Sequence, residues 1–335
     1  MKLSKPYLII FLACCLLFLP FLGSVHLFDW DEINFAECAR EMIASDNYLS
    51  VTIDYRPFHE KPPLFIWMQV LSMKVFGINE FAARFPNAMC GLITLLVLFH
   101  IGKKIKSAQF GALWVLAHAG SFLPHFYFKS GIIDPWFNLF IFLGIYFFTL
   151  YTISEEKNNR NAFFSALFIG FGVLTKGPVA FIIFFLCVII YWSLNRLKRI
   201  ISTAQLILFA LTFIGIGGSW YVFQFATNNE IILEFIKYQY RLLTTEDAGH
   251  GGPIYYHVLV LLFGYFPVSV IAIGAFRKSS SDPPAQSHFK KWMIVFFAVV
   301  LILFSIIKTK IVHYSSLCYF PLSFLAAYSI ENWQM

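Results

Sequence analysis

The sequence has few charged residues and no recognisable cysteine motif. Asp, Glu, Lys and Arg make up 13% of the 335 residues, against roughly 25% in soluble domains. The six cysteines form no CxxC metal motif, and their spacing is not that of a disulfide framework. Internal repeats, low-complexity tracts and linker-like segments are also missing. These absences argue against a soluble domain, a disulfide scaffold and a repeat protein, and we treat residues 1–335 as one domain.

Apolar sequence is abundant instead, with 59% hydrophobic and 19% aromatic residues. Ten runs are candidates for helices that cross about 30 Å of hydrocarbon. They lack the alternation of an outer-membrane barrel, so the spans should be helical. The runs cover 7–27, 81–101, 108–128, 133–153, 161–175, 178–194, 204–224, 255–276, 291–307 and 313–330. We expect an all-α polytopic membrane protein with about ten transmembrane helices, the first an anchor because no A-x-A-like cleavage site follows it.

Lysine and arginine concentrate in alternate loops between these runs. These loops contain Lys103, Lys104, Lys106, Lys157, Arg160, Arg196, Lys198, Arg199, Arg277, Lys278, Lys290 and Lys291. The positive-inside rule places them, with the N-terminus, in the cytoplasm. Most of the net charge of +7 is then explained by the lysines and arginines of these cytoplasmic loops. Nucleic acid would require a continuous basic face on a soluble domain, which the sequence does not show.

The opposite, outer face receives two long loops and three tight turns. The long loops are 28–80 and 225–254, and the turns are 129–133, 175–178 and 308–313. Within the first loop, residues 64–75 are too short and too polar-flanked to span, and we expect an amphipathic helix lying at the interface. Two long loops on one side predict that the functional face lies there.

Two clusters in loop 28–80 carry side chains suited to chemistry. Asp31 and Glu32 directly follow the first apolar run, where reduced hydration shifts the pKa of a carboxylate; alternatively, they only mark the boundary with water. His59, Glu60 and Lys61 follow a turn-rich stretch and precede two prolines. A histidine and a glutamate suit a divalent ion, and a lysine suits phosphate. A solvated interfacial turn is the alternative interpretation of this second cluster.

Asp134 and Lys176 each lie at a tight turn between two apolar runs. Glycine and proline stand beside both, which indicates fixed turns that aim the side chains. An ionisable group at this depth is costly unless it faces a cavity or a partner. The alternative is a charge that extends to the membrane surface along its flexible stem.

The remaining outer segments add anion-binding and metal-binding candidates. Lys308 and Lys310 stand on the outer face against the positive-inside trend, which favours a bound anion there. Arg241 suits phosphate, and His250, with Asp247, suits metal; a polar loop is the alternative for the last two. Cations and carboxylates gathered beside a membrane suit a reaction in which a lipid phosphate is the leaving group. The cations would neutralise the negative charge of that phosphate.

Seven motifs carry these residues in order along the chain. They read DWDEINFAECAREM (29–42), HEKPPL (59–64), IIDP (132–135), LTKG (174–177), YR (240–241), AGHGGPIYY (248–256) and KTKIVHY (308–314). This series resembles the GT-C superfamily of membrane glycosyltransferases, in particular the branch of lipid A aminoarabinose transferase and the protein O-mannosyltransferases. The resemblance spans essentially the whole chain. It implies a GT-C-type helical fold and transfer of a sugar, with inversion, from a polyprenyl-phosphate donor without a nucleotide cofactor.

The resemblance also implies roles for individual residues. The catalytic group is Asp31, Glu32 and Asp134; donor phosphate is bound by Lys61, Lys176, Arg241, Lys308 and Lys310; a divalent metal ion is held by Glu60 and His250; and His59, Asp247 and Tyr314 line the same cavity. The implied partners are the polyprenyl-phosphate sugar, membrane lipids and an acceptor that is a lipid A-like glycolipid, another glycan or a protein. The implied location is a bacterial inner membrane with the active site facing the periplasm.

Two departures and two competing classes complete the hypothesis. Members of this branch often continue into a soluble outer C-terminal domain, which we expect to be absent because the sequence ends at Met335. His59 stands where aromatic residues are common. A transporter or lipid flippase would place its charges near the bilayer midplane and often show a repeat. A non-catalytic scaffold has no reason to gather Lys, Asp and His at three tight turns.

Overall fold

The structure is a computed structural model that describes residues 5–28, 30–58, 60–153, 158–195, 201–227, 229–246, 249–276 and 282–334. The helices are α1 Lys5–Phe18, α2 Trp30–Ser45, α3 Leu64–Phe76, α4 Glu80–Ile105, α5 Ala108–Ala119, α6 Phe122–Phe128, α7 Asp134–Ile153, α8 Asn159–Lys176, α9 Val179–Leu194, α10 Thr203–Gly217, α11 Ser219–Thr227, α12 Asn229–Thr244, α13 Tyr256–Gly264, α14 Val268–Ile271, η2 Ala272–Phe276, α15 Pro284–Ile306, η3 Val312–Cys318 and α16 Tyr319–Gln334. Thr52–Ile53 (β1) and Arg56–Pro57 (β2) form an antiparallel pair. The predicted all-α fold is confirmed.

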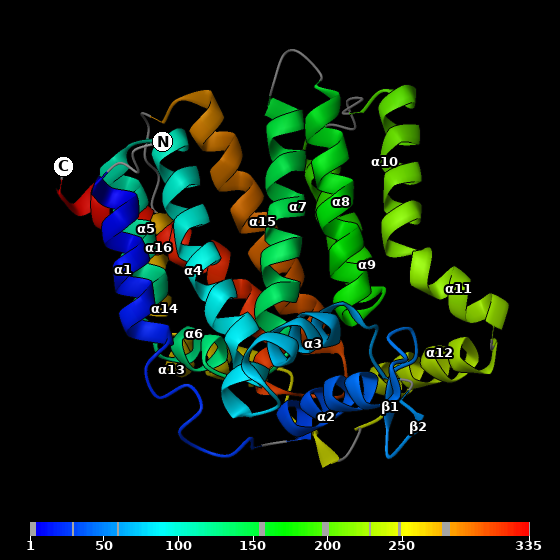
Figure 1. Cartoon of the computed structure of the whole chain (residues 1–335). Helices are drawn as coiled ribbons and strands as arrows, with labels where there is room; N and C mark the ends of the chain where they lie inside the picture. The colour runs from blue at the N-terminus through cyan, green and yellow to red at the C-terminus, as the bar shows by residue number, and fades with distance from the viewer. Residues whose placement is uncertain are drawn as a thin grey trace.

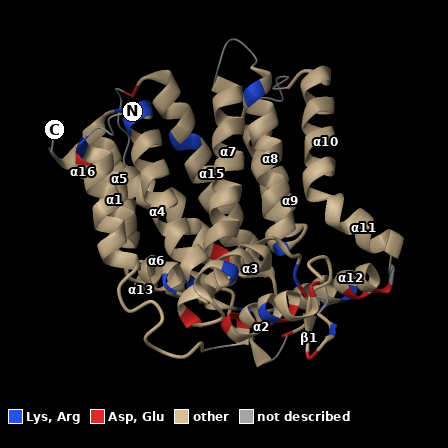
Figure 2. Cartoon of the chain, in the orientation of Figure 1, with Lys and Arg blue, Asp and Glu red and all other residues tan. Residues whose placement is uncertain are grey.

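The long helices run side by side, and a layer of shorter elements crosses one end of them (Figure 1). Helices α4, α7, α8, α9, α10 and α15 form the upright body, whereas α2, α3, α12 and the β1–β2 pair lie across its lower end. Figure 2 shows acidic residues gathered at that lower end and little charge along the middle of the long helices. The crossing layer is built from the two long loops that the sequence assigns to the outer face.

Each of the ten predicted apolar runs contains a helix, although many of these helices are short. Among the described residues, α4, α7 and α15 are individually long and apolar enough to cross a membrane. Two bent pairs also qualify when each is taken as one span: α10 with α11 bends by 52°, and α13 with the segment 268–276 bends by 107°. The first bend follows directly on Gly218, which caps the end of α10.

A buried ion pair fixes the crossing layer to the helical body. Arg84 of α4 pairs with Glu32 of α2 through two hydrogen bonds of 2.8 Å, and both side chains are buried. The same guanidinium donates to the backbone oxygens of Leu22, Val25 and His26. An arginine that binds three carbonyls and a carboxylate is fully paired, which is the condition under which a buried charge is tolerated.

Nearby polar contacts fix the turn that follows α6. The backbone N–H of Gly131 donates to Glu32 Oε1 at 2.6 Å. Asn87 Nδ2 lies 2.6 Å from the carbonyl oxygens of both Ser130 and Ile132. These contacts hold residues 130–132 against α2 and α4, directly before Asp134 at the start of α7. Two candidate acids that are distant in the sequence, Asp31 and Asp134, are therefore positioned by one polar cluster.

Candidate active site

A cavity of about 400 Å³ lies where the crossing layer meets the helical body. We call it the site cavity; its lining comprises Trp30, Asp31, Glu60, Lys61, Lys176, Tyr238, Arg241, Leu242, His250, Ile311, His313 and Tyr314. These residues come from α2, α8, α12, η3 and the intervening loops. The volume falls in the roughly 300–1,000 Å³ range of small-molecule sites. Seven residues predicted from the sequence line this single cavity: Asp31, Glu60, Lys61, Lys176, Arg241, His250 and Tyr314.

Two cations of the site cavity, Lys61 and Arg241, contact the same tyrosine. Lys61 is buried, and its Nζ donates to the Tyr238 hydroxyl at 3.2 Å. The guanidinium carbon of Arg241, one turn further along α12, lies 5.2 Å from the centre of the same tyrosine ring. Glu60 lies 3.7 Å from Lys61 Nζ and balances part of this charge. Tyr238 thus holds a lysine and an arginine on one surface, as bidentate or paired recognition of a phosphate requires.

A second cluster joins two carboxylates, Asp31 and Asp134, through a histidine. Lys176 Nζ lies 2.6 Å from Asp134 Oδ1, and the Asp134 side chain is buried. His313 Nε2 lies 3.6 Å from Asp134 Oδ2 and 3.6 Å from Asp31 Oδ2. Asp134 Oδ2 is a buried acceptor with no hydrogen-bond partner among the described residues. His313 therefore stands between the acid that lines the cavity, Asp31, and the acid behind it.

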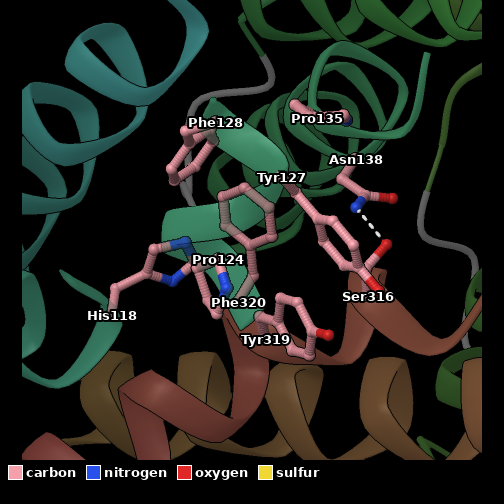
Figure 3. A pocket seen from close by; sticks show the side chains of 9 residues that line it. All are labelled: His118, Pro124, Tyr127, Phe128, Pro135, Asn138, Ser316, Tyr319 and Phe320. Carbon is pink, nitrogen blue, oxygen red and sulfur yellow. Dashed lines mark hydrogen bonds between the residues drawn. The ribbon is translucent and has the colours of Figure 1, made fainter. Parts of the chain in front are cut away.

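A small second cavity lies behind Asp134 and shows how η3 is held. It measures about 20 Å³, and Asn138 and Ser316 are among its lining (Figure 3). Asn138, one turn after Asp134 on α7, donates through Nδ2 to Ser316 Oγ at 2.7 Å. Ser316 in turn donates to the His313 carbonyl oxygen at 2.5 Å. This chain of contacts fixes the backbone that presents His313 to Asp134.

The chain is similar in sequence and fold to known membrane transferases. Residues 60–220 match the family model described as dolichyl-phosphate-mannose-protein mannosyltransferase. The chain is 27% identical, over 97% of its length, to undecaprenyl phosphate-alpha-4-amino-4-deoxy-L-arabinose arabinosyl transferase 1 of Proteus mirabilis. It is 30% identical, over 82% of its length, to an uncharacterized protein of Aquifex aeolicus. The crystal structure of ArnT from Cupriavidus metallidurans bound to undecaprenyl phosphate superposes with a TM-score of 0.86 at 21% identity and covers 98% of this chain.

The chain has the GT-C type of helical fold and is similar in sequence to these transferases. It is an integral membrane protein, as the membrane-length helices and these relatives indicate. The chain spans 59% of the Proteus relative, 61% of the Aquifex relative and 61% of the Cupriavidus structure. The resemblance found in the seven motifs is therefore confirmed as a similarity of sequence and of fold.

Two of the predicted site residues, Glu32 and Lys310, do not line the site cavity. Glu32 was expected to be catalytic, but both of its carboxylate oxygens are held by Arg84 and its side chain is 1% exposed. Lys310 was expected to bind donor phosphate, but its Nζ binds the carbonyl oxygens of Phe304, Ser305 and Ile307. It satisfies the end of α15, where carbonyls lack helical partners, and burial lowers the pKa of its ammonium group.

Lys308 lies beside Lys310 in a separate cavity of about 460 Å³, which also contains Glu246. The structure therefore places these two lysines in a different cavity from Lys61 and Arg241. Asp134 is not part of the cavity lining either, but acts on it through Lys176 and His313. His59 and Asp247 lie outside the described residues.

Three contributors to the site were missed as site residues at the level of sequence. His313 lies in the last motif, but its position alone does not distinguish it from its neighbours Lys310 and Tyr314. Tyr238 precedes Arg241 by three residues, which places the two on one face of a helix, a pattern that periodicity can reveal. Arg84 is a charged residue inside a predicted span, which by itself signals a buried partner.

The predicted metal ligands Glu60 and His250 do line the same cavity. Among the residues that the structure describes, however, no group of three His, Cys, Asp or Glu side chains is placed to hold an ion. Two protein ligands are fewer than the three that catalytic zinc sites typically use. Glu60 and His250 are thus only part of the ligand set that a metal ion needs.

Proposed function

We propose that this chain transfers a sugar from a polyprenyl-phosphate donor to an acceptor hydroxyl or similar oxygen nucleophile in the site cavity. The observation that carries the proposal is that the cations Lys61 and Arg241 and the carboxylate Asp31 line one cavity. Cations aimed at a departing phosphate stabilise the charge that develops on it. A carboxylate in the same cavity is suited to take a proton from the attacking oxygen.

The proposed reaction is a single displacement. The acceptor oxygen forms a bond to the anomeric carbon, the bond from that carbon to the phosphate oxygen breaks, and its electron pair remains on the polyprenyl phosphate. The acceptor proton passes to Asp31. Because one displacement occurs, the anomeric configuration is inverted. Tyr238 keeps Lys61 and Arg241 together at the phosphate, where paired donors bind more strongly than separate ones.

Asp31, rather than Asp134, is the carboxylate we assign as general base. Asp31 lines the cavity, whereas Asp134 is buried behind it with one oxygen bound to Lys176. We assign Asp134 a positioning role: it holds Lys176 and, through its second oxygen, faces His313. His313 lies at the same distance from both acids and so links the base to this fixed pair.

The acceptor class, the location and the metal ion belong to the same proposal. The Proteus relative is named as an arabinosyl transferase for undecaprenyl phosphate-linked aminoarabinose, which supports a pentose donor, and the family model is named for mannose, a hexose. A lipid A-like acceptor is what the resemblance of the seven motifs implies. The lysines and arginines of alternate loops support a bacterial inner membrane with the site cavity on the periplasmic face. A divalent ion between Glu60 and His250 would add positive charge beside the phosphate; metal analysis of protein purified with and without chelator tests it.

A transfer assay tests the function directly. Purified protein in nanodiscs is given radiolabelled polyprenyl-phosphate pentose or hexose with extracted lipid A, and release of free polyprenyl phosphate is followed. We expect sugar-dependent release that Asp31→Asn abolishes while donor binding persists. The matched control is Asp46→Asn, an exposed aspartate at the end of α2. Turnover by Asp31→Asn at the wild-type rate would remove Asp31 from the mechanism. Movement of intact donor across proteoliposomes without release would favour a flippase.

A further inference from the structure

A second large cavity lies at the opposite end of the helical body from the site cavity. It measures about 530 Å³ and runs between α4, α7 and α8. We call it the opposite-end groove. Its wall is apolar and includes Leu96 of α4, Leu143 and Phe147 of α7, and Phe164 of α8. None of these side chains belongs to the glycosyl-transfer site.

The length of the groove matches one leaflet of a bilayer. Along α4 its lining extends from Ile93 to Lys104. These residues are eleven positions apart, which corresponds to about 16 Å of helix at 1.5 Å per residue. Half of a hydrocarbon core of about 30 Å is roughly 15 Å. The groove therefore reaches from the helix ends to about the depth of the membrane midplane.

The open end of the groove is basic. Lys104 near the end of α4 and Arg160 near the start of α8 both line it. Among the residues that the structure describes, its lining contains no Asp or Glu. Within the described part of the chain, neither cation has a carboxylate within ion-pair distance, in contrast to the neighbouring Lys106, which pairs with Glu331 at 2.6 Å. A largely apolar groove with two cations at its open end is complementary to an amphiphile with a negatively charged head group.

We propose that the opposite-end groove binds an anionic phospholipid of the leaflet on that side. Its acyl chain would lie along the apolar wall, and its phosphate would meet Lys104 and Arg160. Basic pockets between transmembrane helices are typical sites for anionic lipid head groups. A polyprenyl phosphate is the less suitable occupant, because the phosphate contacts assigned to it, Lys61 and Arg241, lie at the other end of the protein.

The groove connects to the proposed reaction through two of its helices. Helix α7 begins at Asp134 and α8 ends at Lys176, whose ion pair lies beside the site cavity. Both helices have their other ends at the groove. A lipid that fills the groove replaces missing packing between α4 and the α7–α8 pair, so we expect it to stabilise the fold. The proposal does not depend on the transfer reaction.

Native mass spectrometry of the full chain, released from detergent with defined lipids, tests the proposal. Wild-type protein should retain phosphatidylglycerol in preference to phosphatidylcholine. Each of Lys104→Ala and Arg160→Ala should weaken phosphatidylglycerol binding about fivefold. Lys103→Ala is the matched control: it removes the same charge one residue away, from a side chain directed at the Tyr7 ring. Leu96→Trp should reduce lipid retention with all charges in place.

Several results would overturn the proposal. These are equal retention of the two phospholipids by the wild type, unchanged retention in Lys104→Ala and Arg160→Ala, or an equal loss in the Lys103→Ala control, which would indicate unspecific surface attraction. Preferential retention of undecaprenyl phosphate would overturn the assignment of the occupant. A thermal-shift measurement gives a second readout: phosphatidylglycerol should raise the melting temperature of the wild type more than that of the double variant.

Discussion

At the residue scale, the buried pair of Glu32 and Arg84 positions neighbouring residues and takes no part in the proposed reaction. Each of these side chains is at most 2% exposed, and together they bind α2, α4 and the backbone of residues 22–26 and 131. Asp31 is the next residue along α2, so its placement in the site cavity depends on this pair. The pair is thus a positioning device for the assigned base.

Removing one partner of the pair should therefore destabilise the protein strongly. We expect Glu32→Ala to lower the free energy of unfolding by about 3–5 kcal/mol, because Arg84 is left buried without its carboxylate. The control is Glu37→Ala on the same helix, whose pair with Arg40 is about one third exposed on each side. That change should cost at most about 1 kcal/mol. Thermal unfolding in detergent measures both, and similar losses would contradict this account.

A second residue-scale prediction concerns the cationic side of the site cavity. Lys61→Ala should weaken the binding of polyprenyl phosphate by about 10-fold to 100-fold, the range of a charge-assisted hydrogen bond. Titration of the purified protein with the lipid measures this. Lys237→Ala is the control on α12, because Lys237 is exposed and pairs with Glu234 outside the cavity. Unchanged affinity in Lys61→Ala would exclude the proposed phosphate contact.

At the element scale, small residues let helices of the body approach closely. Gly170 of α8 faces Gly217 of α10: a Cβ on Gly217 would lie 3.1 Å from Gly170 Cα. A similar crossing joins α4 and α5, where a Cβ on Gly102 would lie 2.7 Å from Gly111 Cα. In a membrane, where the lipid is as apolar as the side chains, such close backbone packing is a main source of helix association.

The α8–α10 crossing gives a prediction with a control on the same helix. Gly217→Leu should destabilise the protein by roughly 1–3 kcal/mol, because the added side chain forces the two backbones apart. Gly215→Leu should have much less effect, since a Cβ there meets nothing within 4 Å. Thermal unfolding compares them. An equal loss in both variants would show that the change in helix propensity or bulk, rather than the crossing, is responsible.

At the scale of the whole molecule, the separation of charge predicts which way the protein faces. The site cavity lies at one end of the helical body. Lys103 and Lys104, in the last turn of α4, and Arg160, near the start of α8, lie at the other. By the positive-inside rule, the second end should face the cytoplasm. All six cysteines are free, and five are buried. Because buried cysteines react little with a maleimide, labelling of a single introduced cysteine shows on which side of the membrane it lies.

The orientation prediction uses two such cysteines. Ala44→Cys, on the exposed side of α2, should react with a membrane-impermeant maleimide added to intact cells with a permeable outer membrane. Lys103→Cys, exposed at the other end, should react only after the inner membrane is broken. Labelling of the purified protein in detergent provides the reference for both. The reverse pattern would place the site cavity in the cytoplasm and contradict the periplasmic assignment.

The sequence by itself determined that the protein is helical and lies in the membrane. Backbone groups cannot remain unpaired in hydrocarbon, so ten long apolar runs without alternation predict helices whatever their arrangement. The grouping of functional side chains at one end also followed from the sequence. The positive charge of alternate loops assigns those loops to the inner face, which leaves Asp31, Lys61, Lys176, Arg241 and His250 on the outer face. Helix lengths were predicted less well: the breaks at Gly218 and after α5 divide runs that hydropathy shows as continuous.

Only the tertiary structure decided which of these side chains share the cavity. Asp31 and Glu32 are adjacent, yet one lines the cavity and the other is bound by Arg84, 52 positions away. Lys310 turns back onto the carbonyls of α15, while His313, three residues later, meets Asp31 and Asp134. The physical reason is that the direction of a charged side chain is set by partners that can satisfy it, and in this chain those partners come from distant segments that only the folded helices bring together.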